Sequence, residues 1–219
     1  MINDYIGSRA IFVRMDKVGV LLISGGVESV TLLAQLVDGG DPLQALFIDY
    51  GQRAAKLERQ AAESACARVG IELVAFDLAG VGEQFRNVQQ RKAHIPLPHR
   101  NLVALALGLS YATTLESARL YLAANREDTS AYASSSHLFL AQFRVLAGVL
   151  GNVQLLTPLV GLSKAEIINR GHALGVDYAS TYSCMLGYAV HCGRCAQCMH
   201  RKAAFHEAGF DEPADFYRA

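Results

Sequence analysis

Short runs of hydrophobic residues alternate along this chain with longer segments in which apolar positions recur at helical spacing. The runs predict strands at 18–23, 43–48, 71–76, 120–123 and 153–156. The helical spacing predicts helices at 27–37, 53–69, 102–115, 137–149 and 163–174. Because the strands are continuous apolar runs that alternate with helices, the pattern is typical of βαβ units around a parallel sheet that is buried on both faces.

Local signals mark where several of these helices begin and end. Gly39-Gly40, Gly70 and Gly175 follow predicted helices, and Ser163 and Glu166 form a capping box at the start of the last one. The segments 80–98 and 177–192 lack a regular pattern, so we expect them to be site loops at the carboxyl ends of strands. We predict one α/β domain over 1–176, with a metal-binding segment over 177–219 packed on it.

Composition narrows the functional class. The chain has 219 residues, of which 52% are hydrophobic and 18% charged, as in globular proteins with a large core. Twenty basic residues balance twenty acidic ones, so the surplus of positive charge that binds phosphate backbones is missing. The longest apolar stretch, 102–112, is too short to cross a bilayer, and the N-terminus lacks the apolar core of a secretory signal. We therefore expect a cytoplasmic protein without nucleic-acid or membrane partners.

The loop between the first strand and the first helix has the chemistry of an anion site. Its glycines let the backbone approach a phosphate, and the helix that follows supplies free N–H groups and a favourable dipole. It matches neither the mononucleotide P-loop nor the dinucleotide fingerprint. A tight structural turn is the alternative interpretation. The loop consists of Ser24, Gly25, Gly26, Val27, Glu28 and Ser29.

The cysteines cluster near the C-terminus. In a reducing compartment, clustered cysteines indicate metal ligation before disulfide formation. Four thiolates complete a tetrahedral structural zinc site, although an iron–sulfur cluster also takes four. We expect His191 and His200 beside this site or on the surface, and Cys66 as a buried apolar residue. The four expected metal ligands are Cys184, Cys192, Cys195 and Cys198.

Six motifs in sequence order carry a resemblance to a known family. They are S-G-G-V-E-S at 24–29, D-Y-G-Q-R at 49–53, P-H-R-N at 98–101, P-L-x-x-L-S-K-A-E-I at 158–167, T-Y-S-C at 181–184 and C-G-x-C-x-x-C-x-x-R at 192–201. Together they resemble the 7-cyano-7-deazaguanine synthases, a family of N-type ATP pyrophosphatases. The resemblance implies an open, mostly parallel, doubly wound sheet of the adenine-nucleotide alpha hydrolase (PP-loop) type with a zinc-bearing C-terminal extension.

The resemblance also implies a reaction, that of an ATP-dependent C–N ligase. Such enzymes adenylate the carboxylate of 7-carboxy-7-deazaguanine, let ammonia displace AMP, and use a second ATP to convert the amide into a nitrile. The implied cofactors are Mg²⁺ and structural zinc, with ATP as co-substrate. The loop 24–29 would bind the ATP phosphates, and catalytic roles fall to Glu28, Asp49, Arg100 and Lys164. The implied substrate contacts are Tyr50, Arg100, Asn101, Asp128, Tyr132, Ser134 and Ser136.

The chain departs from the family pattern at several places, one of them a gap from Cys184 to Cys192 that is one residue shorter. Glu28 stands where the family has aspartate, and residues 131–139 lack the Asp, Cys, Arg and Glu of the family's G-Y-P-D-C-R-P-E-F. The change in residues 131–139 motivates an alternative, a divergent ligase of anti-phage defence that transfers the activated deazaguanine to a protein or peptide amine. A tRNA-modifying enzyme of the same group and a non-catalytic zinc-stabilised subunit are further alternatives. A homodimer is also expected, as is common for sheets of this kind.

For single residues, structural roles compete with functional ones. Tyr50 and Tyr132 would stack on a purine or pack as ordinary core aromatics. Arg100 would clamp a phosphate or carboxylate, or form a surface ion pair. Lys164 lies at the start of a helix, where a cation opposes the helix dipole, and this favours a functional role.

Overall fold

A computed structural model describes residues 18–89 and 94–218 and confirms the predicted parallel sheet. Neighbouring strands all run parallel in the order β3-β2-β1-β4-β5, and Leu22 of β1 is in register with Leu46 of β2 and Leu122 of β4. Within the described ranges, no helix is long and apolar enough to span a membrane. The strands are β1 (Gly19–Leu22), β2 (Leu43–Asp49), β3 (Leu73–Asp77), β4 (Arg119–Leu122) and β5 (Gln154–Leu156).

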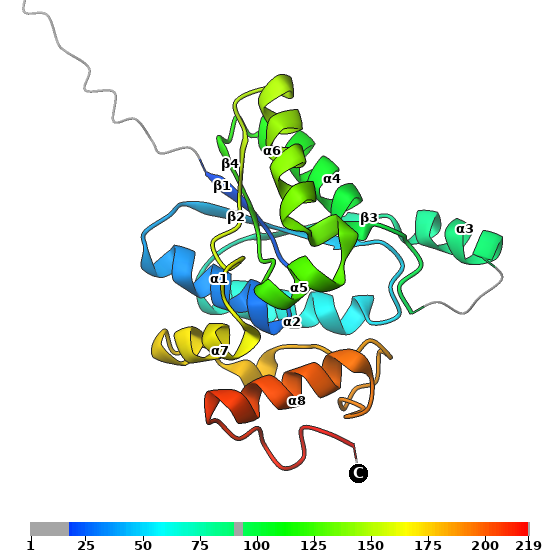
Figure 1. The fold of residues 1–219 in the computed structure, drawn as a ribbon, viewed down its shortest axis with the longest axis vertical. Coiled ribbons are helices and arrows are strands. Elements are labelled where there is room, and N and C mark those ends of the chain that lie inside the picture. The colour runs from blue at the N-terminus through cyan, green and yellow to red at the C-terminus, as the bar shows by residue number, and fades with distance from the viewer. Residues whose placement is uncertain (1–17, 90–93, 219) are drawn as a thin grey trace, which may run out of the picture.

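Helices cover both faces of the sheet, as the uninterrupted apolar strands predict. Leu21 of β1 and the next residue, Ile23, join the core formed with α1 and α2, whereas Val20 and Leu22 join the core formed with α4 and α6. Figure 1 shows these two helical layers on either side of the strands. The helices are α1 (Val27–Asp38), α2 (Ala55–Arg68), α3 (Ala79–Gln89), α4 (Arg100–Thr114), α5 (Arg126–Ala131), α6 (His137–Leu150), α7 (Lys164–Ala173) and α8 (Ala196–Ala208), with 3₁₀ turns η1 (Ala133–Ser135) and η2 (Tyr178–Ser180).

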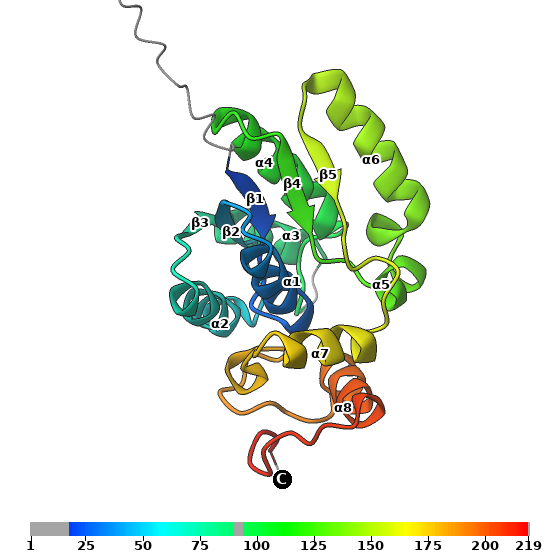
Figure 2. The same ribbon diagram turned by 90° about the vertical axis from the view of Figure 1, so that its left-hand side faces the viewer.

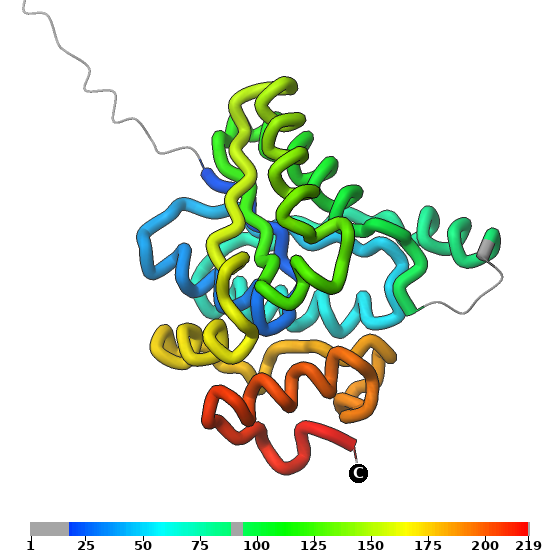
Figure 3. Tube along the Cα trace, viewed as in Figure 1, coloured from blue at the N-terminus to red at the C-terminus, as the bar shows by residue number. Residues whose placement is uncertain are grey.

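The C-terminal segment packs against the first helical layer. Helix α7 packs on α1 and on α8, and Ile167, Ile168 and Phe205 bury their side chains in the core cluster of α1. After α8 the chain folds back along this helix, where the N–H of Arg218 donates to the carbonyl of His191 at 2.8 Å (Figure 3). Figure 2 shows β1 and β4 pointing toward the side on which α7 and α8 lie. A domain boundary near residue 176 stays a prediction.

Three helices, α3, α5 and α8, were not predicted. The segment 80–98 was expected to be irregular, but α3 occupies Ala79–Gln89, and residues 90–93 lie outside the described residues. In α3 the side chains of Val81 and Phe85 are 42% and 41% exposed. Because its apolar residues are not buried along one face, the helix lacks the periodic pattern from which helices are predicted. Helix α5 is too short for such a pattern. The remaining predicted elements are confirmed, with ends shifted by a few residues.

Candidate active site

The candidate site lies where the strand order reverses. The chain builds β1, β2 and β3 outward in one direction and then returns to place β4 on the other side of β1. The loops after β1 and β4 therefore diverge and leave a crevice at the carboxyl ends of the strands, which is where open α/β sheets bind ligands. A cavity of about 260 Å³ lies there, lined by the loops after β1, β2 and β4 and by the first turns of α4 and α7.

The predicted phosphate loop forms one wall of this cavity. Gly25 has φ +75°, and a Cβ on it would come within 2.3 Å of the Glu58 carbonyl oxygen, so this glycine lets the loop lie directly against α2. The hydroxyls of Ser24 and Ser29 lie 3.2 Å apart, and Gly26, the N-cap of α1, provides no side-chain cap. The first N–H groups of α1 are thus left for an anion.

The six loop residues divide into two groups. The side chain of Val27 is 1% exposed and packs in the core, and Gly25 is turned toward α2. The residues that line the cavity are Ser24, Gly26, Glu28 and Ser29.

Glu28 and Lys164 form an ion pair inside the cavity. Lys164 Nζ lies 2.9 Å from Glu28 Oε1, and the two side chains are 13% and 17% exposed. Burial raises the pKa of Glu28, but the charge and hydrogen bond of Lys164 outweigh it and hold this pKa below its ordinary value. Burial likewise opposes the charged form of Lys164, and Glu28 raises its pKa. Lys164 is held in the first turn of α7 by the predicted capping box of Ser163 and Glu166, which is confirmed.

Asn125 connects the loop after β4 to this ion pair. Its Nδ2 donates to Glu28 Oε1 at 3.0 Å, and its Oδ1 accepts the N–H of Asp128 at 2.7 Å. Burial and the charge of Glu28 both raise the pKa of Asp128, which also lines the cavity. Two carboxylates facing one cavity beside a lysine form a donor set that fits Mg²⁺. Asn125 was not predicted as a site residue, although N-x-x-D shortly after a strand is a capping-box signal.

The loop after β2 contributes different residues than expected. Asp49 lies outside the cavity lining, because its Oδ1 accepts the N–H of Gly51 at 2.8 Å and closes a tight turn. Its neighbour Tyr50 does line the cavity, as do Gln52 and Glu58, which were not predicted as site residues. Burial raises the pKa of Tyr50 and of Glu58.

The start of α4 and the serine-rich segment form the opposite wall. Asn101 Nδ2 donates to Ser135 Oγ at 2.7 Å, and the Arg100 guanidinium carbon lies 5.4 Å from the centre of the Tyr132 ring. All four residues line the cavity. No ion pair joins Arg100 to an acid within the part of the chain that the structure describes.

The three serines of 134–136 differ in where the structure places them. Ser135, rather than Ser134 or Ser136, faces the cavity. Ser136 is the N-cap of α6 and accepts the N–H of Phe139 at 3.2 Å, whereas Ser134 lies outside the lining. The helical turn η1 therefore determines which of the three serine side chains faces the cavity. The sequence pattern alone does not predict which serine this is.

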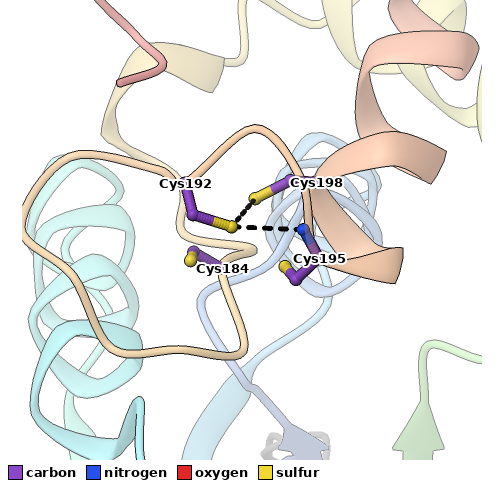
Figure 4. A group of neighbouring side chains, drawn as sticks. All are labelled: Cys184, Cys192, Cys195 and Cys198. Carbon is purple, nitrogen blue, oxygen red and sulfur yellow. Dashed lines mark hydrogen bonds between the residues drawn. The ribbon is translucent and has the colours of Figure 1, made fainter. Parts of the chain in front are cut away.

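The four clustered cysteines come together in one group that could hold a metal ion (Figure 4). Their sulfur atoms all lie within 4.8 Å of one another, and those of Cys192 and Cys198 are 3.8 Å apart. Tetrahedral zinc with bonds of about 2.3 Å requires a sulfur–sulfur separation of about 3.8 Å, so the donor set fits zinc. Burial opposes the thiolate of Cys192, but N–H groups of Arg194 and Cys195 donate to it and lower its pKa to about 6.

Residues around the cysteines tie this metal site to the phosphate loop. His191 is buried, and its Nε2 accepts the N–H of Ser183 at 2.9 Å, which confirms the prediction that it lies beside the site; burial lowers its pKa to about 4. Arg201, also fully buried, donates to Thr181 Oγ1 at 2.8 Å and to Ser183 Oγ at 3.1 Å. Between them, the N–H of Tyr182 donates to the carbonyl of Gly25 at 2.9 Å.

The two other cysteine and histidine predictions are also confirmed. Cys66 is 1% exposed on α2, and burial raises the pKa of its thiol to about 11. His200 lies on the exposed side of α8.

Comparison with known proteins identifies the family. The family profile described as "Queuosine biosynthesis protein QueC" matches residues 18–209. Among curated relatives, the 7-cyano-7-deazaguanine synthase of Methanothermobacter thermautotrophicus is 31% identical, over 90% of this chain and 98% of that protein. The protein of the same name from Thiobacillus denitrificans is 36% identical, over 93% of this chain and 100% of the relative.

Solved structures agree on the fold alone. The NMN synthetase of Francisella tularensis superposes with a TM-score of 0.51 at 16% identity, over 92% of this chain and 81% of that one. The U34-tRNA thiolase NcsA of Methanococcus maripaludis does so with a TM-score of 0.54 at 14% identity, over 86% of this chain and 65% of that one. With the family profile matched over most of its length, the chain belongs to the QueC family of queuosine biosynthesis proteins, whose curated members are named 7-cyano-7-deazaguanine synthases.

Proposed function

We propose that this protein is an ATP-dependent ligase that adenylates the carboxylate of 7-carboxy-7-deazaguanine and converts it, by way of the amide, to 7-cyano-7-deazaguanine. The observation that carries the proposal is the meeting of the phosphate loop, Lys164 and Arg100 around one cavity at the point where the strand order reverses. Anion-binding groups on two sides of one cavity suit a reaction between a triphosphate and a carboxylate. The names of the relatives supply the product, 7-cyano-7-deazaguanine, and the family resemblance supplies the carboxylate substrate.

In the first step, a carboxylate oxygen attacks the α-phosphorus of ATP, and the bond to the pyrophosphate oxygen breaks. The serine hydroxyls and the first N–H groups of α1 hold the departing pyrophosphate, where negative charge develops. Lys164 supplies a positive charge to the same phosphates once it leaves Glu28. Glu28 and Asp128 would hold Mg²⁺, and the bound ion would neutralise phosphate charge. Arg100 orients the substrate carboxylate.

Later steps use the acyl adenylate as an activated carbonyl. Ammonia adds to the carbonyl carbon, loses a proton and displaces AMP, which leaves the primary amide. The amide oxygen then attacks a second ATP, pyrophosphate leaves, and loss of the remaining amide protons with departure of AMP forms the nitrile. Both adenylations need the same arrangement of phosphate loop and lysine, so one cavity serves both.

A divergent ligase that uses a protein or peptide amine is the second candidate. The observation that favours it is the wall formed by residues 131–139, where Tyr132 and Ser135 line the cavity and no charged side chain of this segment does. The family pattern implies charged residues in this segment. Their replacement by small residues leaves the substrate side of the cavity free of the groups that would position ammonia or the second adenylate.

The test is product analysis with ATP, Mg²⁺ and 7-carboxy-7-deazaguanine, with and without ammonia. We expect AMP and pyrophosphate release that depends on the heterocycle, and a nitrile in the mass spectrum when ammonia is present. Lys164→Met should lower AMP formation about 100-fold, the scale of losing one charge-stabilising group, whereas Lys56→Met at an exposed position of α2 should not. AMP formation that stops at the adenylate or amide would favour the protein-amine ligase. Absence of AMP formation with this heterocycle would refute both candidates.

A further inference from the structure

Glu58 is a partly buried acid on the cavity wall that the proposed chemistry does not use. It belongs to the first turn of α2, and its backbone carbonyl lies against the phosphate loop at Gly25. Burial raises its pKa, while the hydrogen bond from Gln52 and the charge of Arg100 favour its ionised form. Removing a carboxyl group from water destabilises the protein unless the group forms hydrogen bonds. An acid in a ligand cavity is therefore expected to bond to protein groups or to a ligand.

The hydrogen bonds of Gln52 fix how Glu58 is presented. Gln52 Oε1 accepts the N–H of Tyr50 at 2.9 Å, so its amide nitrogen must face the other way, where Nε2 donates to Glu58 Oε2 at 2.9 Å. Gln52 is only 6% exposed and cannot turn without losing both bonds. Among residues 18–89 and 94–218, Glu58 Oε1 has no hydrogen-bond partner. Glu58 therefore has one oxygen anchored and one available to a ligand.

The surroundings of Glu58 suit a flat heterocycle. Tyr50 and Tyr182 line the same cavity as Glu58 and contribute aromatic rings to it. His94 also lines the cavity, and its Nδ1 is a buried polar atom without a partner in the described residues. The carbonyl of His94 accepts the N–H of Arg53, next to Gln52, which places it on the same wall. Aromatic faces with an acceptor and an unpaired imidazole nitrogen can stack a planar ring and bond its polar edge.

We propose that Glu58 is a specificity-determining residue that accepts hydrogen bonds from the ring N–H and the 2-amino group of the guanine-type substrate. This inference rests on the proposed function. A carboxylate oxygen matches two adjacent donors, whereas an adenine ring offers an acceptor nitrogen beside its amino group and is repelled at that position. Glu58 thus separates the heterocyclic substrate from the adenine ring of ATP within one cavity.

The first experiment compares substrates on the unmodified protein. Binding of 7-carboxy-7-deazaguanine and of the analogue that lacks the 2-amino group is measured by isothermal titration calorimetry, and the KM for each by AMP release. We expect the analogue to bind at least about tenfold more weakly, because it leaves a partly buried charged acceptor unsatisfied. Equal binding of the two compounds would overturn the proposal. Binding without AMP release would refute the proposed function while leaving the role of Glu58 intact.

The second experiment uses Glu58→Gln, with Glu63→Gln as the matched control. Glu63 lies on the same helix with its side chain 46% exposed. Glu58→Gln should raise the KM for the heterocycle at least about tenfold, leave the KM for ATP within about twofold, and abolish discrimination against the analogue. A rise in the KM for ATP alone would assign Glu58 to adenine and overturn the proposal. Should the variant not fold, as judged by circular dichroism, the analogue comparison on the unmodified protein still decides.

Discussion

The buried ion pair of Glu28 and Lys164 should contribute measurably to the stability of the fold. In Glu28→Gln, Lys164 keeps its buried charge but loses the carboxylate 2.9 Å away. Breaking a buried pair by removing one partner typically costs about 3–5 kcal/mol. Asp128 also raises the pKa of Lys164 and can replace part of the lost interaction. We therefore expect the free energy of unfolding to fall by about 2–3 kcal/mol at pH 7.

The pH dependence follows from the two pKa shifts. Because Lys164 holds the pKa of Glu28 below its ordinary value, the contribution of Glu28 is complete above the unfolded pKa and is lost as pH falls through the folded one. The pKa of Lys164 is raised, so its contribution is complete below the unfolded pKa and is lost as pH rises through the folded one. The difference between wild type and Glu28→Gln should be largest between these limits and should shrink in acid.

Urea unfolding measures this difference. The chain has nine tyrosines and no tryptophan, so tyrosine fluorescence and far-ultraviolet circular dichroism report the transition. The control is Glu63→Gln. Glu63 pairs with Arg59 at 2.8 Å, and the side chains of Arg59 and Glu63 are 54% and 46% exposed. Because this pair is exposed, we expect the control to lower the free energy of unfolding by less than about 0.5 kcal/mol. The reasoning fails if Glu28→Gln costs no more than this control at pH 7, or if its cost is unchanged at low pH.

Three further predictions concern the metal site, the loop after β4 and the phosphate loop. Cys198→Ser should reduce the zinc content of the purified protein to well below one ion per chain, as measured by inductively coupled plasma mass spectrometry, whereas Cys66→Ser should leave it unchanged because Cys66 lies outside the cluster. Asn125→Ala removes both a helix cap and a hydrogen bond to Glu28, so we expect the free energy of unfolding in urea to fall by about 1–2 kcal/mol. A decrease no larger than that of Thr129→Ala would contradict this prediction. Gly25→Ala should raise the KM for ATP at least about tenfold, since its Cβ would collide with the backbone of α2, whereas Gly40→Ala, with the same φ of +75° and nothing within 4 Å, should leave it unchanged.

Much of the architecture follows from local pattern. Residues 19–22 form a strand because every position is apolar and can be buried on one face of the sheet or the other. Helix α7 begins at Lys164 because Ser163 and Glu166 complete a capping box four residues long. The cysteine ligands are similarly evident, since three of them lie within seven residues. Each of these signals involves residues that are close together in the sequence, so each can be recognised from the sequence alone.

Which residues from distant parts of the chain meet in the cavity could be learned only from the tertiary structure. Asp49 and Glu58 are both acids near the end of β2, yet Asp49 closes a turn and Glu58 lines the cavity, because α2 carries Glu58 back against the phosphate loop. Asn125 reaches Glu28 across 97 positions of sequence only because β4 pairs with β1. Sequence by itself determined the strands, five of the helices, the cysteine cluster and the family. Strand order and helix packing determined which side chains share the cavity. Both depend on contacts between residues far apart in the sequence, and such contacts produce no local pattern from which they could be predicted.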